Sequence, residues 1–264
     1  MTLEKKILVP LDVSVKTFRE LQFVLKNAPL FNWSVFIIVP FENDQPDNKE
    51  NVDQQLEGII DQVKRDFPLV EVRGEAIQGS MLQVILDLNT SEHIDLVVSG
   101  QYADISHYTT RNIMEGLVEE CYMPILVLPE SKPIPDLHRI GVMTSFHEDE
   151  IESIKLVEQL FDGKLFITVF HIANEGEKDI ALERMHEWEL DVRGNIKKVD
   201  IDFLVIEANR VIDGVASAIT EKGIDILVVT SIAETFVKRI ISRNYFKEFA
   251  QSQLSQPTLF VRCD

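Results

Sequence analysis

Asp12 and Gly100 each stand at the end of a strand-like apolar run in the first half of the chain. A carboxylate at such a position accepts hydrogen bonds from a ligand, and a glycine lets bare backbone N–H groups approach the oxygens of an anion. Arg111 and Asn112 follow in the next polar stretch, where the guanidinium group offers planar donors to phosphate. These residue types are typical of a binding site for an anionic ligand.

Each of these residues also has a purely structural role open to it. Asp12 can accept backbone N–H groups at a strand-to-helix turn, where aspartate is common, and Gly100 can serve a left-handed turn. Asn112 can cap a helix in which Glu115 closes the capping box, and Asn244 stands at the matching place in the second half. The sequence leaves both interpretations open.

The chain lacks the residue arrangements that catalysis or metal binding requires. His107 has no partner at ligand spacing, and Ser14 belongs to no recognisable serine–histidine–aspartate arrangement. The two cysteines, Cys121 and Cys263, form no CxxC motif, and neither a P-loop nor a strand-following GxGxxG motif occurs. We therefore expect no catalytic residue, no bound metal and no disulfide scaffold.

The elements that must position these residues occur twice. Four segments recur in the same order at offsets of 130 to 133 residues: 7–12 with 140–145, 94–100 with 224–231, 111–115 with 243–247, and 124–127 with 257–260. Four ordered matches at nearly one offset indicate a tandem duplication. A proline-rich stretch, 129–136, separates the copies, so the sequence predicts two domains, 1–132 and 137–264.

Short β-branched runs alternate with longer stretches of helical period in each half. The runs are almost continuously apolar, which is typical of parallel strands covered on both faces by helices. The sequence predicts an α/β fold with one doubly wound, five-stranded parallel sheet in each half. The expected strands are 6–11, 34–40, 70–77, 95–99, 124–128, 138–144, 165–172, 201–207, 224–230 and 257–262, and the expected helices of the first half are 15–28, 51–66, 80–92 and 112–122.

Both halves resemble the universal stress protein family over nearly the whole chain. The resemblance rests on the opening run 7–12 with Ser14, the strand 95–100 and the closing segment 123–129. It implies an adenine-nucleotide alpha-hydrolase-like fold, an aspartate after the first strand that recognises adenine, and a Gly-x2-Gly-x9-Gly-Ser/Thr loop that wraps the phosphates of ATP. By this resemblance the nucleotide site of the first half consists of Asp12, Val39, Gly100, Arg111 and Asn112.

The chain departs from the family pattern at the phosphate loop. Ala103 takes the place of the second glycine, and the pair 111–112 takes the place of the final Gly-Ser/Thr. In the second half Ser145 replaces the aspartate, Ser231 the first glycine and Glu234 the second. We therefore expect ATP or AMP, if either binds, in the first half only, and no other cofactor.

The composition excludes several classes of partner. The chain has 26 Lys and Arg against 44 Asp and Glu, a net charge of −18, so its surface repels phosphate backbones and anionic lipids. No apolar run approaches the roughly 20 residues of a membrane-spanning helix, and we expect no secretory leader. The sequence thus predicts a cytoplasmic protein that binds neither nucleic acid nor membranes.

The last strands of the two halves, 124–128 and 257–262, are apolar, and this connectivity places them at sheet edges. In the resembling family this strand mediates dimerisation, so we expect the halves to pair with each other as a pseudo-dimer within the chain. Whether two whole chains form a homodimer is left open. The predicted function is a non-catalytic stress-response binding or regulatory module with largely degenerate ATP sites. The alternative is an ATP- or AMP-binding protein that keeps one site in the first half, with weak ATP hydrolysis.

Overall fold

The computed structural model describes residues 4–12, 18–41, 48–100, 117, 120–129, 133–231 and 256–262. Contacts divide the chain into two compact units, Met1–Glu130 and Ser131–Asp264. Among these described residues each unit holds five strands, and every strand pair within a unit is parallel. The α/β architecture predicted from the sequence is therefore confirmed. The pairing predicted between 124–128 and 257–262 stays a prediction.

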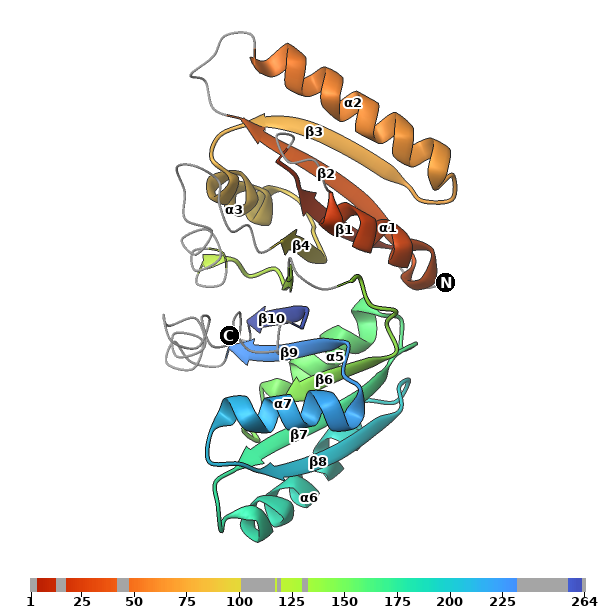
Figure 1. Ribbon diagram of the computed structural model, residues 1–264. Coiled ribbons are helices and arrows are strands. Elements are labelled where there is room, and N and C mark those ends of the chain that lie inside the picture. Colours follow the sequence, from red (N-terminus) through yellow and green to blue (C-terminus); the bar gives the residue numbers. More distant parts are fainter. Residues whose placement is uncertain are drawn as a thin grey trace. The chain divides into compact units, whose positions relative to one another are not determined.

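In the first unit the strand order is β3-β2-β1-β4-β5 (Figure 1). The chain builds outward from β1 through β2 to β3 and then returns to the other side of β1, which places a topological switch point between β1 and β4. Its elements are β1 (Lys5–Pro10), α1 (Arg19–Phe31), β2 (Trp33–Phe41), α2 (Asn48–Asp66), β3 (Val72–Gln78), α3 (Met81–Ser91), β4 (Leu96–Gly100) and β5 (Ile125–Leu128).

The second unit repeats this topology with the strand order β10-β9-β6-β7-β8. Its switch point lies between β6 and β9, the strands that correspond to β1 and β4. Its elements are β6 (Arg139–Met143), α5 (Glu150–Leu160), β7 (Phe166–Ala173), α6 (Lys178–Asn195), β8 (Ile201–Glu207), α7 (Val211–Lys222), β9 (Ile226–Ser231) and β10 (Thr258–Arg262).

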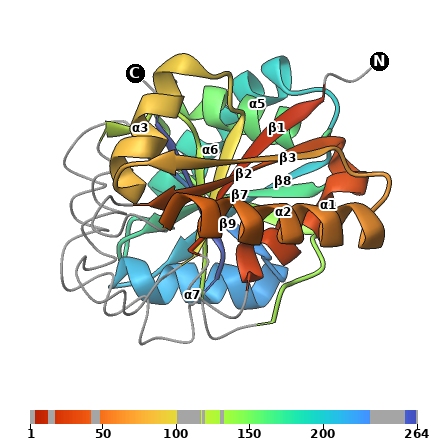
Figure 2. The same cartoon turned by 90° about the horizontal axis from the view of Figure 1, so that it is seen from above.

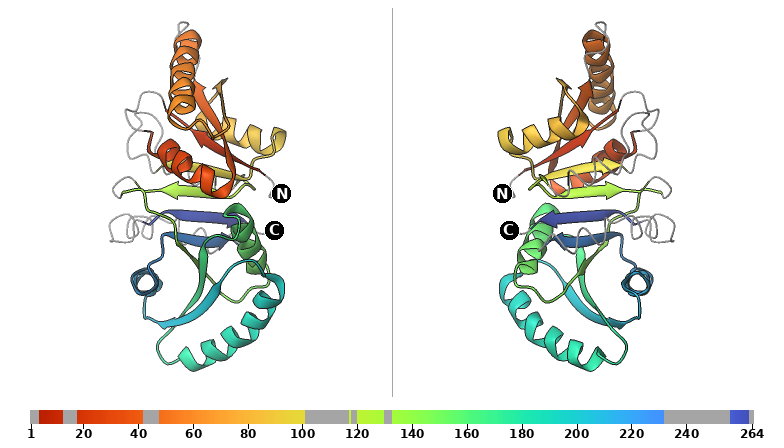
Figure 3. Two further views of the ribbon diagram at one scale, coloured as in Figure 1. Left: turned by 90° about the vertical axis from the view of Figure 1, so that its right-hand side faces the viewer. Right: turned by 90° about the vertical axis from the view of Figure 1, so that its left-hand side faces the viewer.

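Helices cover both faces of each sheet. Figure 3 shows α1 and α3 on opposite faces of the first sheet, and it shows α5 and α6 on one face of the second sheet with α7 on the other. In two perpendicular views α2 runs alongside β3 (Figures 1 and 2). The central strands are buried as a result, and in β1 the side chains of Ile7, Leu8 and Val9 are fully enclosed. Continuous apolar runs are what such two-sided burial requires.

The strand register fixes which residues of the two units correspond. Ile7 pairs with Leu96, and its counterpart Ile140 pairs with Ile226. Counting along β4 and β9 from these pairs, Gly100 corresponds to Thr230. The sequence alignment that put Ser231 in the place of Gly100 is therefore wrong by one residue.

The first helix differs from its expected range of 15–28. Residues 13–17 lie outside the described part of the chain, and α1 continues past 28 to Phe31 with Pro29 inside its last turn. A proline there removes a single helical N–H, so the helix does not have to stop before it. It ends instead at Asn32, which adopts a left-handed conformation (φ 56°) and donates its backbone N–H to the carbonyl of Ala28. The helix expected at 112–122 lies largely outside the described residues.

The amino end of the first sheet carries a triad of charged side chains. Glu92, which follows α3, accepts from Lys6 of β1 at 2.8 Å and from Arg73 of β3 at 3.0 Å. The guanidinium group of Arg73 also lies 3.7 Å from the ring centre of Phe36. One carboxylate thus ties together two strands and the end of a helix.

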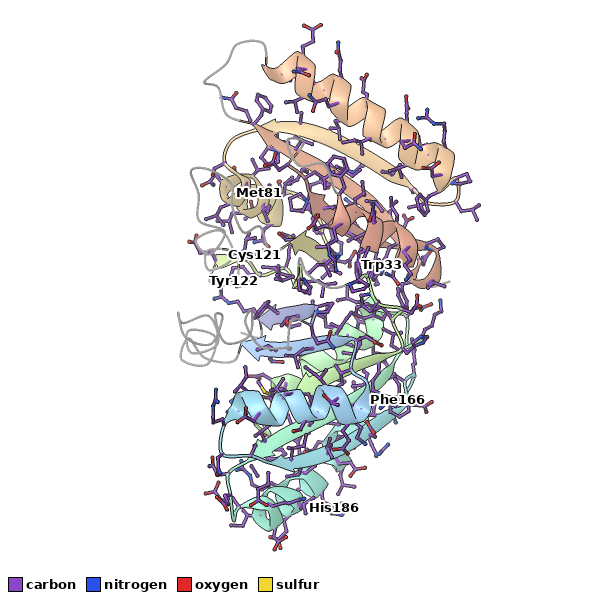
Figure 4. All side chains as sticks on the ribbon, viewed as in Figure 1. Trp33, Met81, Cys121, Tyr122, Phe166 and His186 are labelled. Carbon is purple, nitrogen blue, oxygen red and sulfur yellow. The ribbon has the colours of Figure 1, made fainter. Side chains whose placement is uncertain are left out.

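The second unit has a triad at the same place with the charges redistributed. Arg139 of β6 lies 3.3 Å from Asp202 of β8, and Lys222 of α7 lies 3.1 Å from the other oxygen of Asp202. Arg139 also stacks over the ring of Phe166 at 4.0 Å, a side chain labelled in Figure 4. The acid has moved from the helix end to the outer strand, and a base has taken the position of Glu92. Each triad therefore sets one acid between two bases.

Candidate functional site

Three of the predicted site residues lie at the carboxyl edge of the first sheet. Asp12 follows β1, Val39 lies near the end of β2, and Gly100 is the last residue of β4. The backbone N–H of Leu11 donates to the carbonyl of Ile38 at 2.8 Å, so the chain still runs along β2 as it reaches Asp12. This edge, beside the switch point between β1 and β4, is where open α/β sheets bind ligands. We call it the first-unit site.

The side chains of the first-unit site suit binding. Val39 is 1% exposed and Gly100 is buried, whereas Asp12 is half-buried. They offer an apolar wall, a position where backbone can approach closely and one carboxylate acceptor. Arg111 and Asn112, the other two predicted site residues, lie outside the described part of the chain. No group of three or more metal-ligating side chains occurs among the residues that the structure describes.

The corresponding edge of the second unit is organised around Glu150, the first residue of α5. Its carboxylate is buried, with only 3% of the residue exposed. It accepts the backbone N–H groups of Ser145 at 2.9 Å and His147 at 3.1 Å, and the hydroxyl of Ser145 at 2.8 Å. The hydroxyl of Thr144 also donates to it. A carboxylate at a helix N-terminus is further favoured by the helix dipole.

The turn after β6 therefore supplies its own anion. It begins as in the first unit, because Thr144 N–H donates to the carbonyl of Phe170 at 2.9 Å, as Leu11 does to Ile38. The donors that follow, which an anionic ligand would need, already bind Glu150. An external anion would have to displace a hydrogen-bonded carboxylate that belongs to the chain.

Phe146 lies in the same turn in a conformation that is rare for a residue with a side chain, with φ at +66°. Its ring centre lies 4.3 Å from that of His171 and 6.4 Å from that of Trp188, which it meets at an angle of 71°. The guanidinium group of Arg184 lies 5.0 Å from the same ring centre. The ring also packs against a buried apolar cluster formed by Ala173, Ala181, Met185 and Val205.

The partner of this ring occupies a position already singled out in the first unit. Ile38 pairs with Pro10 and Phe170 with Met143, so the next residue of each strand, Val39 and His171, correspond. His171 Nδ1 lies 2.8 Å from the carbonyl oxygen of Thr144; because a carbonyl only accepts, Nδ1 carries the proton. In the second unit the equivalent of Val39 thus holds the turn and packs against the ring of Phe146.

The end of β9 is closed as well. The hydroxyl of Thr230 donates to the hydroxyl of Ser153 in α5 at 2.9 Å, and both residues are buried. Thr230 corresponds to Gly100, so a side chain fills the position at which the first unit has none. Sequence reasoning missed Glu150, Phe146 and His171. The sequence did contain a signal for this network: two hydroxyl residues, at 144 and 145, come shortly before a helix that begins with glutamate.

No protein-family model and no curated protein matches this sequence. Solved structures do match. The chain superposes on a protein of unknown function from Pseudomonas aeruginosa PAO1 with a TM-score of 0.68 at 13% identity, covering 100% of this chain and 94% of that one. A universal stress protein from Archaeoglobus fulgidus DSM 4304 gives a TM-score of 0.68 at 14% identity, covering 98% and 96%.

The fold is that of the universal stress proteins. The same fold also occurs in the cytoplasmic domain of a prokaryotic cation chloride cotransporter, which matches with a TM-score of 0.58 at 13% identity over 98% of this chain and 95% of that domain. The fold is therefore used by proteins of different kinds. Among the described residues no helix has the length and apolar character needed to cross a membrane.

Proposed function

We propose that this chain is a universal-stress-protein-like module that acts in the cytoplasm by binding a partner or ligand, without catalysis, and that its ATP sites are largely degenerate. The observation that carries the proposal is the buried Glu150 carboxylate. It uses the backbone donors of Ser145 and His147 that a phosphate would require. A triphosphate placed there would meet a like charge and find these amides occupied.

The absence of catalytic groups in the sequence supports a binding role. A general acid or base needs a titratable side chain within hydrogen-bond reach of the reacting group. In the second unit the carboxylate nearest the switch point is hydrogen-bonded on both oxygens, and the ring nitrogen of His171 that faces the turn is bound to a backbone carbonyl. Such groups hold the turn together.

A second candidate function is an ATP- or AMP-binding protein that keeps one site in the first unit, with slow ATP hydrolysis. It is favoured by one contrast between the units. Gly100 has no side chain at the position that Thr230 closes in the second unit. In this case Asp12 and Val39 hold the base, and Arg111 and Asn112 supply donors to the phosphates.

Equilibrium dialysis of the full chain against ATP and AMP at millimolar concentration separates the two candidates. Weak, non-saturating uptake supports the binding module with degenerate sites. Saturable binding that falls about tenfold or more in Asp12→Ala, the loss expected for one charge-assisted hydrogen bond, would establish the second candidate instead. Asp61→Ala, which removes an exposed carboxylate of α2, is the matched control and should leave uptake unchanged.

A further inference from the structure

The ring of Phe146 is held as a bound ligand would be. Its immediate neighbours are the rings of His171 and Trp188 and the guanidinium group of Arg184. A second ring at close range, an aromatic edge and a cation over the face are favourable contacts for a flat π-system. We call the space that this ring fills the aromatic slot.

The aromatic slot lies at the place that matches the first-unit site. Phe146 directly follows Ser145, the counterpart of Asp12, and its ring packs against that of His171, the counterpart of Val39. The Phe146 ring therefore lies, in the second unit, at the position that corresponds to the one where the first-unit site would hold a base. This correspondence rests on the second candidate function, in which Asp12 and Val39 hold the base.

The backbone of Phe146 indicates that the ring's position costs conformational energy. A φ of +66° is unfavourable for a phenylalanine and unstrained for glycine. The backbone N–H donates to Thr144 Oγ1 at 2.9 Å, a bond that glycine at this position also makes. The turn can therefore keep its shape when the ring is removed.

The indole N–H of Trp188 adds a chemical preference. It is buried and has no hydrogen-bond partner among the residues that the structure describes. A phenyl ring offers it no acceptor, whereas a purine carries several ring nitrogens that accept. A nitrogen heterocycle that brought an acceptor to this N–H would gain a hydrogen bond that the phenyl ring cannot make.

We propose that Phe146 is an internal occupant of the aromatic slot and that its ring keeps a nucleoside out of the second unit, while the Glu150 carboxylate keeps out the phosphates. Removing its ring opens the slot to a planar purine. Because the Glu150 carboxylate still holds the backbone donors of the turn, the opened slot takes a nucleoside in preference to a nucleotide triphosphate.

The test is photolabelling of the full chain with 8-azidoadenosine, with peptide mapping and with competition by adenosine or ATP. In the wild type, labelling that adenosine competes away should be absent from 131–264. In Phe146→Gly, labelling that adenosine competes away should appear in peptides of β7 or α6 at about ten times the wild-type level or more. The reason is that an occupied slot binds only in the fraction of molecules in which the occupant has left it, and this reduces the apparent affinity. Adenosine should compete better than ATP.

Asp162→Gly is the matched control, because it also places glycine at a positive φ of the second unit, outside the slot. It should gain no label. Competable labelling of the second unit in the wild type overturns the proposal, and so does a folded Phe146→Gly that gains none. If circular dichroism shows that Phe146→Gly is unfolded, Phe146→Ala takes its place, with the same expected and contrary outcomes. Labelling of 1–130 is scored separately, so failure of the first-unit site is told apart from failure of the slot.

Discussion

Glu150 accepts the backbone N–H of Ser145 at 2.9 Å across the turn that joins β6 to α5. The two residues are only five positions apart, yet their bond occupies a backbone donor that an anionic ligand at this edge of the sheet would need. At this carboxyl edge the second unit therefore holds an anion of its own. At the corresponding edge of the first unit, Asp12 follows β1 and β4 ends in Gly100.

Removing the Glu150 carboxylate should destabilise the second unit. Glu150→Ala leaves the N–H groups of Ser145 and His147 and the hydroxyl of Thr144 without their acceptor, so we expect the free energy of unfolding to fall by about 3 kcal/mol. Glu150→Gln keeps one acceptor oxygen and should cost about half as much. Urea denaturation followed by circular dichroism measures both.

Glu152→Ala is the control for this prediction. Glu152 lies in the same first turn of α5, but its side chain is 65% exposed and it pairs only with Lys155 in the part of the chain described. Its loss should cost at most about 0.5 kcal/mol. Equal effects of Glu150→Ala and Glu152→Ala would mean that the buried network contributes nothing beyond a surface ion pair.

The strands could be predicted from the sequence, whereas the turn that follows β6 could not, and the reasons are physical. Continuous apolar runs such as 7–11 report burial on two faces directly, so the predicted strands agree with the structure to within one or two residues at most ends. The sequence gives no such signal for the conformation of Phe146, because a residue with a positive φ is usually a glycine. The correspondence of Gly100 with Thr230 likewise depends on the hydrogen-bond register of the strands. The apolar segments 94–100 and 224–231 differ in length by one residue, so the sequence alone does not fix this register.

Lowering the pH should weaken the first triad. The hydrogen bond from Lys6, and then the charge of Arg73, hold the pKa of Glu92 below its ordinary value of 4.5. A depressed carboxyl pKa stabilises the folded state above the unfolded-state value, and that stabilisation is lost as the pH falls through the folded-state value. The stability difference between the wild type and Glu92→Gln should thus be present at neutral pH and disappear below pH 4.5.

The redistributed charges of the two triads predict a rescue. Lys222→Glu places a second carboxylate beside Asp202 and leaves Arg139 as the only base of the triad, so we expect a loss of about 1 kcal/mol. Adding Asp202→Arg recreates the arrangement of Lys6, Arg73 and Glu92 and should recover most of it. A double-mutant cycle by urea denaturation gives the coupling energy. Additive losses would show that the triads act through their separate residues.

Two helical glycines should respond to alanine with opposite signs. At Gly214 of α7 a Cβ would lie 2.8 Å from Ile172 Cγ2, a branch-point methyl group of β7 that cannot rotate away freely. Overpacking of this kind costs about 1–3 kcal/mol, and the better helix propensity of alanine returns about 1 kcal/mol of it, so Gly214→Ala should be destabilising overall. At Gly194 of α6 nothing lies within 4 Å of the added Cβ, so Gly194→Ala should stabilise by about 0.5–1 kcal/mol. Melting temperatures that rise for both variants would contradict the close packing of α7 on β7, since propensity alone would then govern both positions.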